Sequence, residues 1–449
     1  MLAVIVFCLL SLLLVLGKLL RSAIPLFQKL YLPSSVIGGL LGLFIFTVFQ
    51  KYIPVQWINS IKLLPGFLIN VIFASLFLGA VTPKLSTILR TAFPQICMGQ
   101  LLAWGQYTVG LGLAGFLFLP LFKLNPAFGN LLEIGFQGGH GTVGGTADVF
   151  KSFKWEDGIA LGYTVATCGM IIGIVIGMIL VNWALKKGHV KEIRTFKERK
   201  QMERIGIYTL QEQPPAGLQT VFCDSIDSLA FHISLIGLAI LAGFGLLKGL
   251  QHLEIFLFPD AKMRIFKGFP LFPLCMIGGV FLQIILNKVK LGNLVNKEQM
   301  QRLSGTALDF LVVSAVATIQ LKVVANNFLP LLILVIAGSI FCVFTIMFLG
   351  PKLLKKAWFE KAIAEFGQAT GVTATGLMLL RTVDPESKTE AAASFGYKQL
   401  IHEPIMGGGL WTAFALTLVF TMGWLPVWII SCVMFVIWLF IAALVIKKV

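Results

Sequence analysis

The chain has 449 residues, of which 57% are hydrophobic and 12% are charged, and its mean hydropathy is +0.90. The charged fraction is about half of that in a typical soluble domain, so the composition excludes an ordinary soluble protein. A net charge of +16 would suggest a nucleic-acid partner in a soluble chain. In a membrane protein it indicates Lys and Arg beside the cytoplasmic ends of the spans, so we expect an integral membrane protein that binds no nucleic acid.

The chain starts with an apolar run from Met1 to Leu20 that has Lys18 and Arg21 at its end and no small-residue cleavage site. This pattern predicts a retained first span with its N-terminus outside the cell. The seven cysteines are dispersed, with no Cys-x-x-Cys pair and no clustering with His. We therefore expect neither disulfide bonds nor a zinc site.

Apolar runs bounded by charged residues, Pro or Gly predict about eleven transmembrane helices. In chain order they cover residues 1–20, 33–50, 63–82, 93–120, 158–185, 229–250, 269–288, 304–321, 327–350, 399–422 and 425–446. Two further apolar stretches, 126–150 and 359–380, are short and rich in Gly and Thr. We expect each to be a re-entrant segment. The predicted fold class is an all-α integral membrane protein.

A basic linker at 186–228 divides the chain into an N-terminal repeat, 1–185, and a C-terminal repeat, 229–449. When this linker is placed in the cytoplasm, most Lys and Arg residues, including those from Lys352 to Lys398, fall on the same side, as the positive-inside rule expects. The C-terminus is then cytoplasmic as well. The protein is expected to be a multi-pass protein of the cell's inner membrane, with the lipid bilayer as its surroundings.

The two halves share a motif, since the run from Pro33 to Gly38-Gly39 matches the run from Pro273 to Gly278-Gly279 in spacing. The two Gly-rich segments also take corresponding places in their halves. An odd number of spans in each half inverts the second half relative to the first. Inverted-topology repeats with interrupted helices are typical of secondary transporters.

Glycines crowd the first Gly-rich segment between 135 and 145, and each lowers helix stability by about 1 kcal/mol relative to Ala. They suit a backbone that must turn and expose its N–H and C=O groups to a ligand, such as Na⁺ or a carboxylate. Glycines that only allow close helix packing are the alternative, and the density of Gly beside polar residues favours binding. The candidate substrate-binding residues are Gln137, Gly138, Gly139, His140, Gly141, Thr142 and Thr146.

The second segment has the same kind of composition, and two such segments that meet near the middle of the membrane would enclose a polar pocket. Its candidate substrate-binding residues are Gln368, Thr370, Gly371, Thr373 and Thr375. Arg381, directly after it, could meet a substrate carboxylate, although a cytoplasmic loop cation explains it more simply.

Two carboxylates lie in apolar runs, where a charge is costly unless it is paired or hydrated. Asp309 is a candidate cation ligand, a proton site if H⁺ drives transport, or an interfacial residue at a helix end. Glu403 is a candidate ligand too, and Pro404 after it could instead start the tenth span. With the hydroxyls of Thr142 and Thr370, these are the Na⁺ candidates. The His402-Glu403 pair lacks the second His of a zinc protease, because position 406 is Met406, and we predict no catalytic residue.

Several motifs together resemble the sodium/glutamate symporter family. They are the run from Gly138 to Thr142, the Pro33–Gly39 motif, and the run from Ala166 to Met170 that Gly173 and Gly177 follow. The resemblance implies two inverted repeats, Gly-rich re-entrant loops at the translocation site, Na⁺ as the coupling ion without a cofactor, and a homodimer. The second loop lacks a Gly-x-Gly-x-Gly run and a further span follows Glu403, which indicates a divergent member.

The expected function is therefore Na⁺-coupled symport of glutamate, an acidic amino acid, into the cell by alternating access, and not enzymatic catalysis. An Na⁺- or H⁺-coupled carrier of another organic anion, such as a dicarboxylate, is the alternative. A channel or an intramembrane enzyme agrees less well with the repeats and the lack of a catalytic set.

Overall fold

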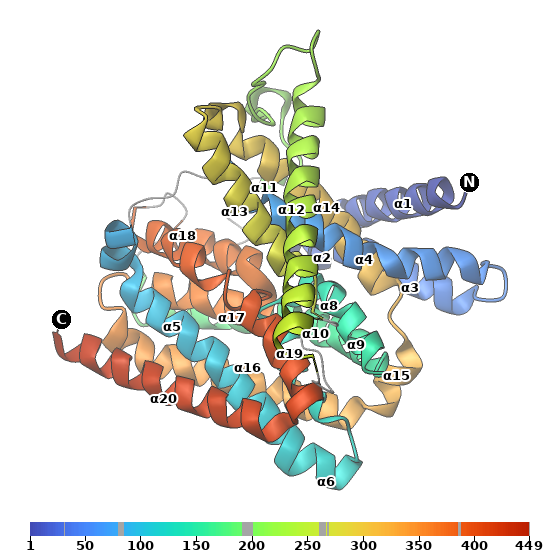
Figure 1. Cartoon of the computed structure of the whole chain (residues 1–449). Helices are drawn as coiled ribbons and strands as arrows, with labels where there is room; N and C mark the ends of the chain where they lie inside the picture. The colour runs from blue at the N-terminus through green and yellow to red at the C-terminus, as the bar shows by residue number, and fades with distance from the viewer. Residues whose placement is uncertain are drawn as a thin grey trace.

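The computed structural model describes residues 1–30, 32–79, 85–190, 201–259, 266, 269–384 and 388–448, which form helices and turns without a β-strand (Figure 1). In this part of the chain, seven helical segments are long and apolar enough to cross a membrane. They are α1 (Leu2–Ala23), α4 (Val55–Ser75), α5 (Leu85–Gly112), α10 (Asp157–Lys186), α12 (Ser228–Leu257), α16 (Phe328–Leu353) and α20 (Trp424–Lys448). Shorter apolar helices are α3 (Ser34–Val48), α13 (Phe272–Lys288) and α19 (Leu410–Met422).

The remaining helices are shorter or more polar. They are α2 (Pro25–Lys29), α7 (Leu131–Phe136), α8 (Gly139–Gly145), α9 (Ala147–Ser152), α11 (Gln201–Ile205), α14 (Lys297–Ala317), α15 (Leu321–Asn326), α17 (Trp358–Val383) and α18 (Ala391–His402). Helix α5 continues through a π-helical turn (Leu113–Phe118) into α6 (Leu119–Phe122), and single 3₁₀ turns lie at Pro126–Asn130, Leu210–Glu212 and Gly292–Leu294.

The helices form two connected groups. Helices α5, α16 and α20 lie side by side, and α17 packs against α10, α16 and α18 (Figure 1). Helices α1, α3, α4 and α14 pack on one another, and α12 runs beside α13 and α4. Helix α8 contacts both α4 and α10, so the first Gly-rich segment lies between the two groups.

Most of the predicted spans coincide with helices. The spans at 1–20, 33–50, 158–185, 229–250, 269–288, 327–350 and 425–446 each lie on one helix, and 93–120 lies on α5 and its continuation. The predicted span 304–321 lies on α14, which begins earlier, at Lys297, and ends at Ala317. Residues 80–82 of the predicted third span lie outside the described residues, as do residues 191–200 of the predicted linker.

The prediction of a single helix at 399–422 is wrong. Helix α18 ends at His402, the chain turns through 403–409, and α19 starts at Leu410. Gly407 and Gly408 have φ values of +67° and +104°, in the region that glycine adopts at little cost. Glu403 is the C-cap of α18, so Pro404 does not open a helix at this carboxylate.

Both predicted Gly-rich segments are interrupted helices. The first consists of a 3₁₀ turn followed by α7, α8 and α9, and the second is α17, whose backbone leaves helical geometry at Gly371 and Val372. Each is surrounded by a large apolar core. The completely buried aromatic side chains around the first are Tyr107, Phe118, Phe128, Phe136 and Phe150, and those around the second are Phe359, Phe366 and Phe395.

The two Pro-to-Gly-Gly motifs make corresponding contacts. A Cβ atom at Gly38 would overlap the carbonyl oxygen of Leu13 in α1, and one at Gly278 would overlap that of Ala239 in α12. Each motif thus packs its helix, α3 or α13, directly on the backbone of the first helix of its own half. Such close approach is possible only where the side chain is a hydrogen atom.

The described part of the predicted linker returns to the end of the first helix. The ammonium of Lys18 in α1 donates to the carbonyl oxygen of Ile205, at 3.0 Å, and the Arg21 guanidinium donates to that of Arg204, at 3.4 Å. The C-terminal end of α1 and the start of the described linker therefore lie together.

Candidate functional site

The first helix break lies at Gln137 and Gly138, between α7 and α8. Gly139, the first residue of α8, has a φ of +69°, which disfavours any residue with a β-carbon. A Cβ atom at Gly138 would lie 2.6 Å from the carbonyl oxygen of Ile134. The glycines therefore allow the backbone to turn at this place.

The second break lies at Gly371 and Val372 in α17, where Val372 has a φ of 63° and a ψ of 172°. A positive φ is rare for a β-branched residue and persists only where the surroundings impose it. A Cβ atom at Gly139 would overlap Cγ1 of Val372. The two breaks, far apart in sequence, therefore touch each other.

A third break, at 403–409 between α18 and α19, meets the first. A Cβ atom at Gly408 would overlap Oγ1 of Thr142, and one at Gly407 would lie 3.3 Å from Cγ of Gln137. The sequence analysis missed this break because it read 399–422 as one apolar run. The run Gly407-Gly408-Gly409 after Pro404 was the local signal for it.

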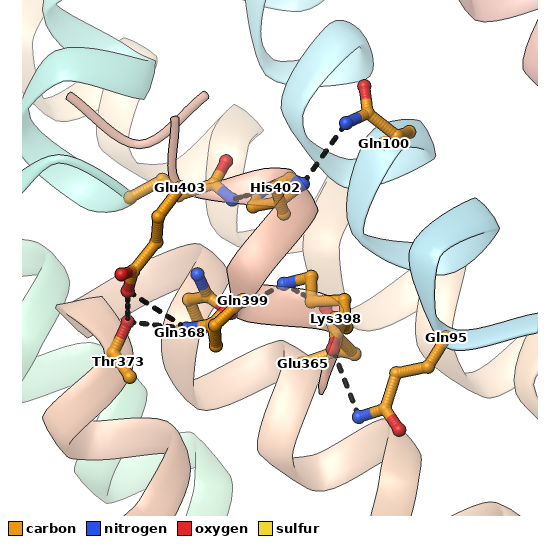
Figure 2. A network of polar contacts seen from close by, with 10 residues as sticks. Gln95, Gln100, Glu365, Gln368, Thr373, Lys398, Gln399, His402 and Glu403 are labelled. Carbon is orange, nitrogen blue, oxygen red and sulfur yellow. Dashed lines mark hydrogen bonds and ion pairs between the residues drawn. The ribbon is translucent and has the colours of Figure 1, made fainter. Parts of the chain in front are cut away.

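A carboxylate lies beside the second break. Thr373, directly after the break, donates its hydroxyl to Oε1 of Glu403 at 2.6 Å, and the Gln399 amide donates to both, at 2.7 Å and 3.1 Å (Figure 2). Among the described residues no ion pair joins Glu403 to a cation. Glu403 and Thr373, both predicted as site residues, are therefore brought together by the structure.

A buried ion pair lies on the other side of Gln399 (Figure 2). The Lys398 ammonium lies 2.9 Å from Oε2 of Glu365, with side-chain exposures of 0% and 1%, and donates to Oε1 of Gln368 at 2.5 Å. Gln95 of α5 donates to the other Glu365 oxygen at 3.0 Å. The prediction that Lys398 is a cytoplasmic loop cation is wrong, since the residue lies inside α18 and is fully buried.

His402 connects α18 with two further elements. Its Nδ1 lies 3.3 Å from the Gln100 amide nitrogen of α5, and the Gln137 amide lies against its Nε2. Trp104 donates to Oε1 of Gln100 at 3.0 Å, which directs the Gln100 amide nitrogen toward the imidazole. Nδ1 therefore accepts from the Gln100 amide.

The carboxylate of Glu133 in α7 holds the third break. Its Oε1 accepts from the Gly407 backbone N–H at 2.8 Å and from the Thr412 hydroxyl at 3.1 Å, and its Oε2 accepts from the Tyr107 hydroxyl at 2.6 Å. Glu133, Tyr107 and Thr412 are completely buried. Since all three donors converge on one carboxylate, α7 fixes the turn that precedes α19.

The comparison with known families agrees with this arrangement. A profile of the sodium/glutamate symporter family matches residues 1–384. The chain belongs to the sodium/glutamate symporter family. No curated protein matches the chain. The resemblance predicted from the Gly-rich motifs is confirmed, and the chain is a multi-pass membrane transporter of a family with Na⁺ as coupling ion.

The family match contains the first two breaks and ends before α18. Lys398, Gln399, His402, Glu403 and the third break lie after it. These polar groups therefore lie beside the two breaks of the matched region but outside the match itself. Sequence reasoning missed Lys398 because it fell one residue outside the predicted span 399–422, and span boundaries are uncertain by about four residues.

The threonines predicted in the two segments are mostly bonded to their own helices. Thr142 donates to Gly138 at 2.9 Å, Thr146 to Thr142 at 2.9 Å and Thr370 to Phe366 at 2.8 Å, each time to the backbone oxygen. Thr375 is buried, and its Oγ1 would lie 2.8 Å from a Cβ atom at Gly371. A bonded hydroxyl keeps lone pairs for a cation.

Three other candidates lie apart from the breaks or at their edge. His140 is buried, and its Nε2 lies 2.9 Å from the Thr167 hydroxyl of α10. Asp309 in α14 has an exposed side chain beside Ser35 of α3. Arg381 is exposed in the last turn of α17. Neither Asp309 nor Arg381 is bonded to the buried network in the described part of the chain.

The candidate Gly141 faces α4, because a Cβ atom at this position would lie 2.7 Å from Ile69.

Proposed function

We propose that the protein is a Na⁺-coupled symporter of glutamate that works by alternating access, and that the translocation site lies where the three helix breaks meet. The observation that carries this proposal is the contact of Gly139 with Val372, which joins the breaks of the two Gly-rich segments. Broken helices that meet inside a membrane protein are typical of the substrate and ion sites of secondary transporters. Family membership supports glutamate as the substrate and Na⁺ as the coupling ion.

The Na⁺ site is proposed at Glu403. Its carboxylate and the Thr373 hydroxyl offer oxygen atoms, which hard cations prefer, and no cationic side chain among the described residues forms an ion pair with this carboxylate. The hydroxyls of Thr142 and Thr370 and the more distant Asp309 remain further Na⁺ candidates. Bound Na⁺ would remove the cost of a half-buried unpaired carboxylate.

The substrate is proposed to lie against the first break. The backbone N–H groups of Gly139–Gly141 form the first turn of α8 and have no partner within that helix, which suits them to the carboxylate group of an amino acid. The candidates Gln368, Gly371 and Thr375 line the facing segment, and Thr146 and Arg381 are the outermost candidates. Na⁺ and substrate at neighbouring positions would raise each other's affinity.

The two halves are proposed to be inverted repeats, 1–185 and 229–449, on either side of the linker. The corresponding contacts of Gly38 with α1 and of Gly278 with α12 support this proposal. We place the N-terminus outside and the linker and C-terminus in the cytoplasm. The contact of Lys18 with the linker backbone supports a common side for these cations. A homodimer is part of the proposal.

The test is uptake of labelled glutamate by the purified protein in proteoliposomes. An inward Na⁺ gradient should drive concentrative uptake, and an equal K⁺ gradient should not. Uptake driven equally well by a pH gradient without Na⁺ would refute Na⁺ coupling, and stronger uptake of a labelled dicarboxylate would refute glutamate as substrate. A channel would equilibrate glutamate without accumulating it.

A further inference from the structure

The Lys398 ammonium occupies a position with the features of a cation site. It contacts Oε2 of Glu365 at 2.9 Å and Oε1 of Gln368 at 2.5 Å, two oxygens one helical turn apart on α17. It also lies over the ring of Phe395, 5.5 Å from the centroid. Carboxylate and amide oxygens are ligands for hard metal cations as well as for an ammonium group.

The site is built by three elements around a buried carboxylate. Gln95 of α5 holds the second oxygen of Glu365 at 3.0 Å, and a Cβ atom at Gly99 of α5 would lie 2.9 Å from Nζ of Lys398 and overlap its Cε. Glycine at position 99 thus leaves the room that the ammonium group occupies. Glu365 is fully enclosed, so a positive charge must stay beside it for as long as it is ionised.

The site is directly connected to the proposed Na⁺ site. Gln368 lies three residues before Gly371 at the second break, and Gln399, next to Lys398, bonds Thr373 and Glu403 after it. Two carboxylates therefore flank one break. Glu365 forms an ion pair with Lys398, whereas Glu403 forms no ion pair among the described residues.

We propose that Lys398 is a tethered cation that permanently fills a second metal-ion position of this transporter, and that Glu365 and Gln368 are the ligands of that position. The inference rests on the proposed Na⁺ coupling for its place in the cycle, but the binding site itself can be tested without transport. Lys398 lies in α18, after the residues that the family profile matches. The carrier then requires one Na⁺ fewer per cycle than the same site without the lysine.

The experiment counts Na⁺ bound to the purified protein in lipid nanodiscs by equilibrium dialysis with radioactive Na⁺. It is done at alkaline pH, where an accessible carboxylate is ionised. Lys398→Ala empties the position and leaves room for water to complete the coordination. We expect this variant to bind one more Na⁺ per polypeptide than the wild type. Lys398→Met, which keeps the length of the stem without the ammonium, is the second variant if the first fails to fold.

The matched control is the double variant Lys398→Ala with Glu365→Gln, which has the same net charge at the site as the wild type. It should bind the same number of Na⁺ ions as the wild type. Equal Na⁺ counts in the wild type and both single variants would overturn the proposal and leave a purely structural ion pair. A wild type that binds no Na⁺ would refute the proposed coupling ion, while a gain of one Na⁺ in Lys398→Ala would still support the tethered cation.

Discussion

Gly139 and Val372 touch at the point where the two Gly-rich helices break. A Cβ atom at Gly139 would overlap Cγ1 of Val372, and both residues have a positive φ, of +69° and 63°. Glycine adopts this conformation at little cost, whereas the strained backbone of Val372 persists only where its surroundings impose it. At this contact both halves of the chain face the proposed translocation site.

Gly139→Ala should therefore abolish transport and lower stability. The left-handed conformation costs a residue with a β-carbon roughly 1–2 kcal/mol, and the overlap with Val372 adds to this cost. Thermal unfolding of the detergent-solubilised protein and Na⁺-driven glutamate uptake measure the two effects. The matched control is Gly237→Ala in α12, where no atom lies within 4 Å of the new Cβ. Equal behaviour of the two variants would contradict the proposed contact.

Thr373→Val should weaken Na⁺ binding with little effect on folding. The substitution keeps the shape of the side chain and removes the hydroxyl that bonds Glu403 at 2.6 Å. Loss of one hydrogen bond to a charged group predicts an increase of about tenfold in the Na⁺ concentration for half-maximal uptake. Thr345→Val in α16 is the control, because the Thr345 hydroxyl bonds only its own helix, at Phe341. An unchanged Na⁺ dependence in Thr373→Val would exclude this residue from the ion site.

Glu133→Ala should be strongly destabilising, whereas Glu133→Gln should be tolerated. Alanine leaves the buried donors of Tyr107, Gly407 and Thr412 without their acceptor, and each such donor costs about 1–3 kcal/mol. Glutamine keeps one oxygen for Gly407 and Thr412. The difference in melting temperature between the two variants measures the effect. If both variants melt together with the wild type, Glu133 does not hold the third break.

Gly38→Ala and Gly278→Ala should each reduce stability by similar amounts. In both positions the new methyl group meets a neighbouring backbone oxygen, of Leu13 or Ala239, and overpacking of this kind costs about 1–3 kcal/mol. Gly305→Ala in α14, with open space around the new Cβ, serves as the control. A loss of stability in only one of the two variants would argue against equivalent roles in the two repeats.

Cys223 offers a test of orientation. It is an exposed cysteine in the predicted linker, so a membrane-impermeant maleimide should label it in inside-out vesicles and not in intact cells. Cys223→Ser identifies the signal, because the other cysteines lie in apolar helices. Labelling of Cys223 in intact cells would reverse the predicted topology.

The sequence by itself determined most of the helical segments and the two Gly-rich segments that contain the first two breaks. Each membrane span must satisfy its own backbone hydrogen bonds, so apolar length alone predicts where a helix runs. Glycine and proline act on the backbone at their own positions, and for that reason the crowding of glycine around Gly139 indicated a turn. The same signal for a turn is present at Gly407–Gly409, but the long apolar run around these residues led to the prediction of one continuous helix.

Only the tertiary structure decided the role of Lys398. By its type and its place near a predicted boundary, it resembled the other cytoplasmic cations. Its burial depends on Glu365 and Gln368 in α17 and on the space beside Gly99 in α5. These partners come from distant parts of the chain, and the free energy of a charge in a membrane protein is set by what surrounds it in space, which local composition does not contain.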